Sequence, residues 1–219
     1  MQRLEEIRQA RLEKLQKLRD LGVDPYPPKS SYTLTSIVKA REEEGKTLAV
    51  AGRLWRWREH GNVTFADLKD SSGQIQLLFQ KKNLDSQFDL LKLFDVGDFL
   101  AVCGEVIKTS AGEITIDVAK FELLSKSLRP LPDDWHGLKD IEVRYRKRYL
   151  DLLLDPEMRH RFDVRTSVFK ETRNYLDALG FKEVETPIFH PLYGGANAKP
   201  FTTHMQALDT DFYLRIAFA

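Results

Sequence analysis

The chain has 219 residues, of which 42% are hydrophobic and 31% are charged, a balance that excludes a collagen, a mostly disordered chain and a membrane protein. Its 34 Lys and Arg residues against 33 Asp and Glu residues give a net charge of +1, so any nucleic-acid binding must depend on local patches of charge. The single cysteine, Cys103, excludes an internal disulfide framework and a cysteine-rich zinc site. Because no long apolar run and no leader-like N-terminus occur, we expect a soluble cytoplasmic protein with no membrane partner.

Residues 1–21 are predicted to form an amphipathic helix. Leu4, Ile7, Leu15 and Leu18 recur at helical spacing, and Gly22 with the prolines that follow ends the pattern. Basic side chains on this helix alternate with acidic ones. This alternation favours a solvated helix packed on the next domain over a phosphate-binding face.

From residue 48 to residue 125 the sequence changes to short β-rich runs separated by turn signals. A helical stretch, Leu84–Leu93, separates the third run from the fourth. Five strands with one helix in this place are the order of an OB-fold, a small barrel whose open face commonly holds single-stranded nucleic acid. The predicted strands are Leu48–Arg58, Val63–Leu68, Gln74–Gln80, Asp98–Lys108 and Glu113–Leu124.

Side chains of a strand alternate between its two faces, which assigns the residues of the predicted barrel to an inner or an outer side. Phe65 shares a face with Asp67, and Gln76 lies opposite the apolar residues of its strand. A face that carries Asp67 is not expected to be sealed core. The pattern leaves open whether Phe65 stacks on a base or is an ordinary barrel residue. The same alternation predicts that Trp55 and Trp57 face one way and pack, with Arg56 and Arg58 opposite.

The last third of the chain begins with a predicted connector rich in proline and charge. Its basic run, Arg144–Arg148, is either a solvated stretch or a phosphate contact. A helix ending at Gly180, a strand Phe181–Pro187 and a further strand Asp211–Ile216 follow. Four regions result: an N-terminal helix and linker (1–46), an OB-fold domain (47–128), a connector (129–160) and a further domain (161–219).

Specific segments resemble one enzyme family. Residues Gly180–Pro187 resemble motif 1 of class II aminoacyl-tRNA synthetases. A motif of this kind that follows an OB-fold in the chain resembles the arrangement in the synthetases that charge tRNA with lysine, aspartate or asparagine. Leu131–Leu138, Arg144–Leu152 and Tyr193–His204 resemble the lysyl-tRNA synthetases in particular. The resemblance implies an α+β fold, with an N-terminal helix, a five-stranded OB-fold barrel and the beginning of an antiparallel catalytic domain.

The resemblance also implies roles for individual residues. The anticodon-reading surface of the family falls on Arg58, Phe65, Gln76 and Glu113, with the Phe65 ring stacked on the central uridine. Gly195 matches the glycine whose backbone contacts the lysine substrate, and Pro187 matches the proline at the family's dimer interface.

The implied activity is the ATP- and Mg²⁺-dependent attachment of lysine to tRNA(Lys) through lysyl-adenylate, by a homodimer. The family continues into Pro-Glu where this chain has Phe218 and Ala219, and motifs 2 and 3 are absent. We therefore expect no catalytic and no metal-binding residue within the chain, and no activity of the chain alone. The alternatives are a stand-alone tRNA-binding module, an aspartyl- or asparaginyl-tRNA synthetase and, disfavoured by the OB portion, a ligase that lysylates a translation factor.

Overall fold

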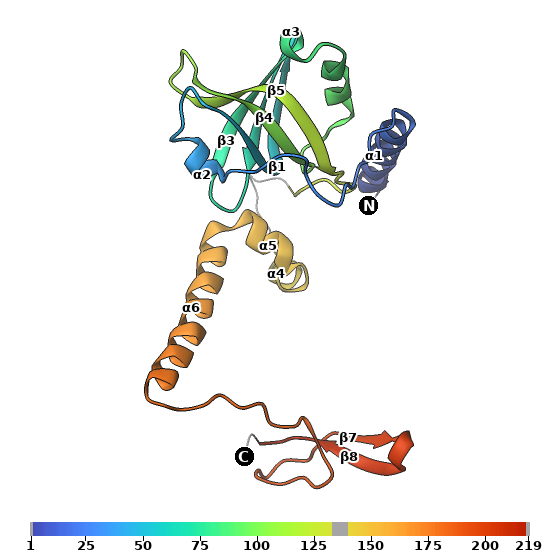
Figure 1. Cartoon of the computed structure of the whole chain (residues 1–219). Coiled ribbons are helices and arrows are strands. Elements are labelled where there is room, and N and C mark those ends of the chain that lie inside the picture. The colour runs from blue at the N-terminus through green and yellow to red at the C-terminus, as the bar shows by residue number, and fades with distance from the viewer. Residues whose placement is uncertain (1, 133–139, 218–219) are drawn as a thin grey trace. The chain divides into compact units, whose positions relative to one another are not determined.

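The computed structural model describes residues 2–132 and 140–217 and divides the chain into two compact units, residues 1–133 and 134–219 (Figure 1). Most of the segment Leu131–Leu138, and both Phe218 and Ala219, lie outside the described residues. The finer boundaries predicted after residues 46, 128 and 160 stay predictions.

The first unit is a closed five-stranded barrel with helical additions. Neighbouring strands follow the order β1-β2-β3-β5-β4, and all pairs are antiparallel except β3 with β5. The five predicted strands are confirmed, because alternating apolar residues and the turn signals between them mark the strands well. The predicted helical stretch is a single α-turn followed by a 3-10 helix. The elements are α1 (Gln2–Asp20), α2 (Ile37–Ala40), β1 (Thr47–His60), β2 (Val63–Lys69), β3 (Gln74–Gln80), α3 (Lys81–Leu84), η1 (Asp85–Leu93), β4 (Phe99–Lys108) and β5 (Ile114–Ser125).

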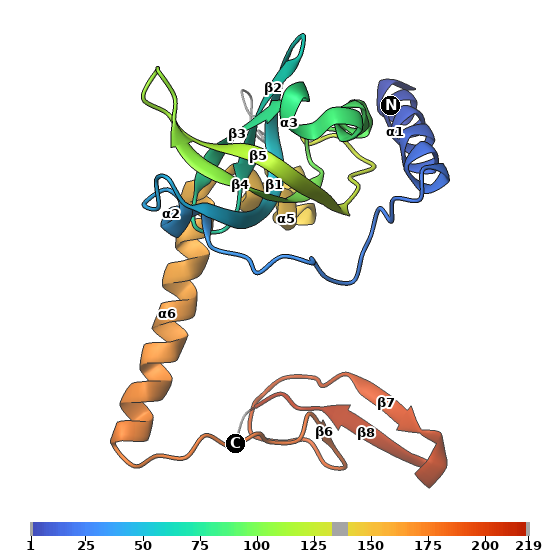
Figure 2. The same ribbon diagram turned by 45° about the horizontal axis from the view of Figure 1, so that its top comes forward.

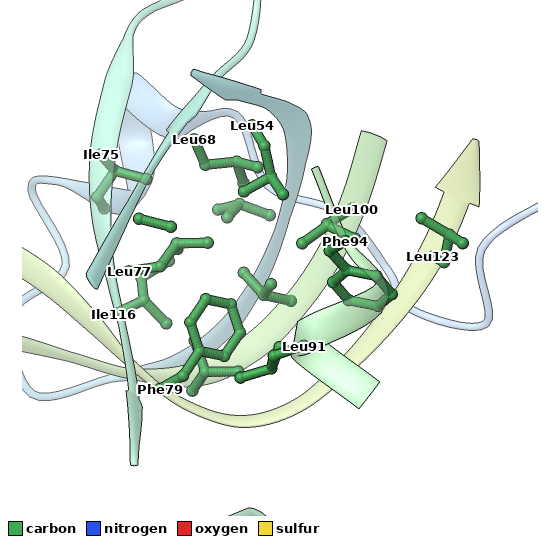
Figure 3. Packing of buried hydrophobic residues seen from close by; sticks show 14 of the residues in the cluster. Leu54, Leu68, Ile75, Leu77, Phe79, Leu91, Phe94, Leu100, Ile116 and Leu123 are labelled. Carbon is green, nitrogen blue, oxygen red and sulfur yellow. The ribbon is translucent and has the colours of Figure 1, made fainter. Parts of the chain in front are cut away.

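The core of this unit fills the inside of the barrel and the space under η1 (Figure 3). Phe79 is fully buried in this core, with its ring centroid 5.8 Å from that of Trp57 and 5.9 Å from that of Phe121. Leu91 and Phe94 close the core on the side of η1. Closure leaves no free sheet edge, since each strand pairs on both sides.

Helix α1 packs against the barrel through both apolar and charged contacts. Leu18 is fully buried, and the Arg11 guanidinium donates to the carbonyls of Val96, Ser127 and Arg129. Lys14 donates to Asp95 at 2.7 Å, and the buried Lys126 ammonium donates to the same carboxylate. The prediction of a helix packed on the next domain is therefore confirmed.

The second unit contains helices followed by a small antiparallel sheet of order β6-β8-β7 (Figure 2). The predicted helix ending before Gly180 is confirmed. It begins inside the predicted connector, because Pro156 occupies its first turn and Asp155 caps it. The elements are α4 (Ile141–Arg146), α5 (Arg148–Leu154), α6 (Pro156–Ala178), β6 (Phe189–His190), β7 (Thr202–Met205), η2 (Gln206–Leu208) and β8 (Thr210–Leu214).

One predicted strand of this unit is wrong. Residues 181–187 form no strand, and no described segment pairs with their backbone as a neighbouring strand. Residues that favour β-structure do not make a strand by themselves, since the backbone groups need a partner. The strand predicted over Asp211–Ile216 is confirmed as β8, which pairs with β7, a strand that the sequence did not predict. None of the described helices has the length and apolarity required to cross a membrane.

Candidate nucleic-acid interface

The outward-facing side chains of β1, β2, β3 and the start of β5 form the candidate interface, called here the outer face. Arg58 lies directly opposite Phe65 in the β1–β2 register, and Gln76 lies opposite Asp67 on one side and Thr115 on the other. Three of the four predicted anticodon-binding residues therefore come together on three adjacent strands.

Burial confirms the predicted faces of β2 and β3. Ala66 and Leu68 are fully buried, whereas Phe65, next to Ala66 in sequence, is only half-buried. Ile75 and Leu77 are buried, whereas Gln76 is half-buried. Phe65 and Gln76 thus lie outside the core, in positions from which a ring and an amide can meet a ligand.

The burial of Asp67 on the outer face is unexpected. The sequence predicted that the face carrying Asp67 is open, but the Asp67 side chain is buried. The Arg58 Nη2 atom donates to Asp67 Oδ1 at 3.4 Å, and the Arg56 Nε atom lies 3.9 Å from Asp67 Oδ2. A buried carboxylate requires such partners. Asp67 therefore restrains the Arg58 guanidinium beside the Phe65 ring.

The Gln76 amide is oriented by a buried hydroxyl. Thr115 Oγ1 donates to Gln76 Oε1 at 2.9 Å, across the parallel pairing of β3 with β5. Because the amide oxygen accepts this bond, the amide NH₂ is the group left to donate to a ligand. Thr115 was not singled out in the sequence, and Asp67 was considered there only as a sign of an open face; both act through contacts between strands.

Glu113, the fourth predicted residue, immediately precedes β5. Its backbone N–H donates to Thr109 Oγ1 at 3.1 Å and its carbonyl accepts from the Thr109 N–H at 3.0 Å. These bonds hold the end of the β4–β5 hairpin, and the side chain is exposed. Glu113 lies two residues before Thr115, and therefore at the border of the outer face.

The two tryptophans of β1 separate, so the prediction that they face the same way is wrong. A β-bulge between Leu54 and Arg56 inserts Trp55 as an extra residue, which reverses the alternation. Trp55 lies on the outer face, with the Lys69 Nζ atom 4.5 Å from its ring centroid. Trp57 packs on the core instead.

The predicted site residues of the second unit lie in exposed coil. Gly195 has φ of +86°, a left-handed conformation that glycine adopts without strain. The Pro187 carbonyl lies 2.9 Å from the Nε2 atom of His190. The predicted roles of Gly195 and Pro187 stay predictions.

The arginines of the basic run are paired with carboxylates. Arg144 donates to Asp151 at 2.7 Å and to Asp155 at 2.9 Å, while Arg148 also pairs with Asp151. Arg146 pairs with Glu142 one turn earlier, and both side chains are exposed. These contacts hold the short helices α4 and α5 together and leave Arg146 the most accessible of the three guanidinium groups.

Within residues 2–132 and 140–217, no three His, Cys, Asp or Glu side chains cluster closely enough to hold a metal ion.

Two family models match the chain. Residues 48–124 match the OB-fold nucleic acid binding domain, and residues 140–219 match the class II tRNA synthetases for D, K and N, which are aspartate, lysine and asparagine. The first match covers the barrel that carries the outer face.

Similar proteins from several bacteria are lysine–tRNA ligases. That of Syntrophomonas wolfei is 49% identical over 218 residues, which are 98% of this chain and 44% of the relative. That of Carboxydothermus hydrogenoformans is 48% identical over 99% of this chain and 45% of the relative. That of Moorella thermoacetica is 47% identical over 94% of this chain and 43% of the relative. The chain thus spans less than half the length of these relatives. Over the residues that it spans, the chain is similar to lysine–tRNA ligases, and its residues 140–219 match the class II tRNA synthetases.

Proposed function

We propose that the outer face binds the anticodon of tRNA(Lys). The observation that carries the proposal is the placement of Arg58, Phe65 and Gln76 on three adjacent strands of an OB barrel, with Glu113 at the border. The similarity to lysine–tRNA ligases over nearly the whole chain supports this choice of RNA.

Each side chain suits a different part of an unstacked base. The Phe65 ring offers a stacking surface, and the Arg58 guanidinium covers the base from the side, held by Asp67. The Gln76 NH₂ group donates to a carbonyl of uracil, because its oxygen is occupied by Thr115. The Glu113 carboxylate accepts from a base N–H. Stacking thus supplies affinity, while the amide and the carboxylate read the base edge.

The activity proposed for the whole protein is the ATP-dependent attachment of lysine to this tRNA. The lysine carboxylate attacks the α-phosphorus of ATP, which forms lysyl-adenylate and releases pyrophosphate. A terminal ribose hydroxyl of the tRNA then attacks the carbonyl of lysyl-adenylate, which forms lysyl-tRNA and releases AMP. Such a reaction depends mainly on positioning and electrostatic stabilisation. The Gly195 backbone would contact the lysine, and Pro187 would lie at a homodimer interface.

The direct test is Phe65→Ala, assayed by fluorescence anisotropy with a labelled anticodon stem-loop of tRNA(Lys). Loss of one base–aromatic stack should weaken binding by about 1–3 kcal/mol. Phe201→Ala, which removes an exposed ring of the second unit, should leave affinity unchanged and serves as the control. Severe destabilisation with unchanged affinity per folded molecule would instead make Phe65 a core residue.

Base reading is tested separately at Glu113. Glu113→Ala should weaken binding to the lysine anticodon far more than binding to a stem-loop with a changed central base, because the carboxylate contacts a base edge. Equal losses for the two stem-loops would show that Glu113 does not read sequence.

A further inference from the structure

We infer that the RNA-binding surface extends beyond Phe65 to a second aromatic step, formed by Trp55 and Lys69, which binds a nucleotide of the anticodon loop outside the base triplet. The inference rests on the proposed function, since it assigns a further part of the same RNA to the same face. Neither residue belongs to the set that the family resemblance implied.

The β-bulge is what creates this step. In a regular strand with no bulge between Leu54 and Arg56, strict alternation would place Trp55 on the same side as Trp57. Instead the Trp55 ring lies under the Lys69 ammonium on the outer face, and Trp57 lies against Phe79 in the core. An aromatic ring beside a cation is the pairing that single-stranded nucleic acids bind, because the ring stacks and the cation meets the phosphate.

Charge along the outer face favours an anionic strand. Arg53, which lies opposite both Lys69 and Phe99, places its guanidinium 4.3 Å from the Phe99 ring centroid. Arg56 lies between this region and Arg58 and is exposed. Asp67 is the acidic residue among the outward positions of β2 and of β1 from 53 to 58. Its side chain is buried and already paired with Arg56 and Arg58. A stripe of four cations therefore continues from the anticodon site past the bulge. Its members are Arg58, Arg56, Arg53 and Lys69.

The length of the stripe exceeds what a single base needs. Lys69 lies four residues beyond Phe65 on the same strand, which is about 13 Å at a rise of about 3.3 Å per residue. Successive stacked nucleotides are about 3.4 Å apart, so a second nucleotide fits between these positions. The flexible stem of Lys69 lets its ammonium move from the ring to a phosphate, which frees the ring for stacking.

The second step should supply affinity without selectivity. A stacked ring and a phosphate contact accept any base, whereas Gln76 and Glu113 meet base edges. Trp55 and Lys69 are thus expected to matter for a loop that extends past the triplet and to be irrelevant for the triplet alone.

The experiment uses the full chain with two ligands, the anticodon stem-loop of tRNA(Lys) and the uridine trinucleotide. Trp55→Leu should weaken stem-loop binding about five-fold or more, the lower limit for a lost stack, and leave trinucleotide binding unchanged. Lys69→Gln should weaken stem-loop binding and reduce the slope of log K against log salt by about 0.7, as for one phosphate of a single strand. Phe65→Ala should weaken both ligands.

Two matched controls separate binding from folding. Trp57→Leu changes the same residue type two positions away but on the inner side, so it should lower the melting temperature and spare affinity per folded molecule. Lys120→Gln removes an exposed lysine elsewhere on the barrel and should spare the salt slope.

The outcomes distinguish the inference from the proposed function. If Phe65→Ala weakens binding while Trp55→Leu and Lys69→Gln do not, the second step is overturned and the anticodon site stands. If Trp55→Leu weakens the trinucleotide as much as the stem-loop, Trp55 belongs to the triplet site and the extension is overturned. If the unaltered chain binds neither RNA, the proposed function itself fails.

Discussion

In the first unit, large apolar side chains such as Leu54 and Phe79 are fully buried, whereas in the second unit Val184, Leu192 and Phe201 are each more than three-quarters exposed. The barrel encloses its own core, while α6 buries none of its residues. Both units carry regular apolar patterns. Such a pattern therefore indicates that a face needs a partner, but not where that partner lies.

The difference follows from topology. Each barrel strand has a neighbour on both sides, so local alternation and long-range pairing reinforce each other. The sheet of the second unit has only three short strands, and its helix α6 presents apolar residues outward. We expect the two units to respond very differently to equivalent substitutions.

The sharpest comparison is Phe79→Ala with Phe201→Ala. Phe79 is fully buried between two other rings, so its truncation should lower the free energy of unfolding by about 3–5 kcal/mol. Phe201→Ala should change that free energy by no more than about 0.5 kcal/mol, since its ring is exposed. Urea denaturation followed by circular dichroism measures both, and equal losses would remove the contrast between the units.

Lys126→Met tests whether the first unit also depends on buried charge. The Lys126 ammonium is fully buried, 2.7 Å from the equally buried Asp98 carboxylate, and its loss should cost about 3–5 kcal/mol at neutral pH because Asp98 is left uncompensated. Burial raises the pKa of Asp98 above its usual value even with Lys126 present. The folded state thus binds a proton there more readily than the unfolded chain, and stability falls as pH rises through that window.

Without Lys126 the pKa of Asp98 should rise further, so the deficit of the variant should be largest near neutral pH and shrink as the pH falls towards the usual range of a carboxyl group. Urea denaturation at a series of pH values measures this change. A deficit that stays constant over the series would mean that lost packing, not charge, causes it.

The barrel and the faces of Phe65 and Gln76 were predictable because they depend on local alternation and turns. The bulge at Trp55 was not, because counting alternate residues assumes that each position pairs once. The burial of Asp67 depends on arginines of the neighbouring strand. Long-range register decides such details, and a single sequence does not display it.

In the second unit the helix was predictable and the sheet only partly so. Residues 181–187 contain β-favouring residues such as Phe181 and Val184 before a proline, but they lack a partner strand among the described residues. Conversely, Thr202–Met205 has little apolar pattern and becomes β7 only by pairing with β8. The resemblance to a family, and not the pattern, supplied Arg58, Glu113, Gly195 and Pro187 as candidate residues.

Asp155→Ala tests how far the second unit relies on local contacts. Asp155 accepts from the backbone N–H groups of Met158 and Glu157 at the start of α6, and the Met158 bond above all lowers the pKa of its carboxyl group. The stabilisation is present above the usual carboxyl pKa and is lost as pH falls through the lowered value. The variant should lose helical circular dichroism at neutral pH and show less further loss in acid than the unaltered chain.

Asp177→Ala is the matched control, since it removes a carboxylate near the opposite end of the same helix, where a negative charge is unfavourable. Its helical signal should stay equal or rise. A loss equal to that of Asp155→Ala would indicate that any charge change disturbs α6, and that the cap has no special part.

The smallest effect on folding is expected for Arg146→Gln, which removes an exposed pair with Glu142 and should alter stability by no more than about 0.5 kcal/mol. If Arg146 contacts a tRNA phosphate, the same change should weaken full-length tRNA(Lys) and a tRNA with an altered anticodon equally, and reduce the salt slope by about one. Arg161→Gln breaks a similar exposed pair, with Glu157, and should leave the salt slope unchanged. A loss that depends on the anticodon would place Arg146 among the base-reading residues, and so extend specific recognition from the barrel into the second unit.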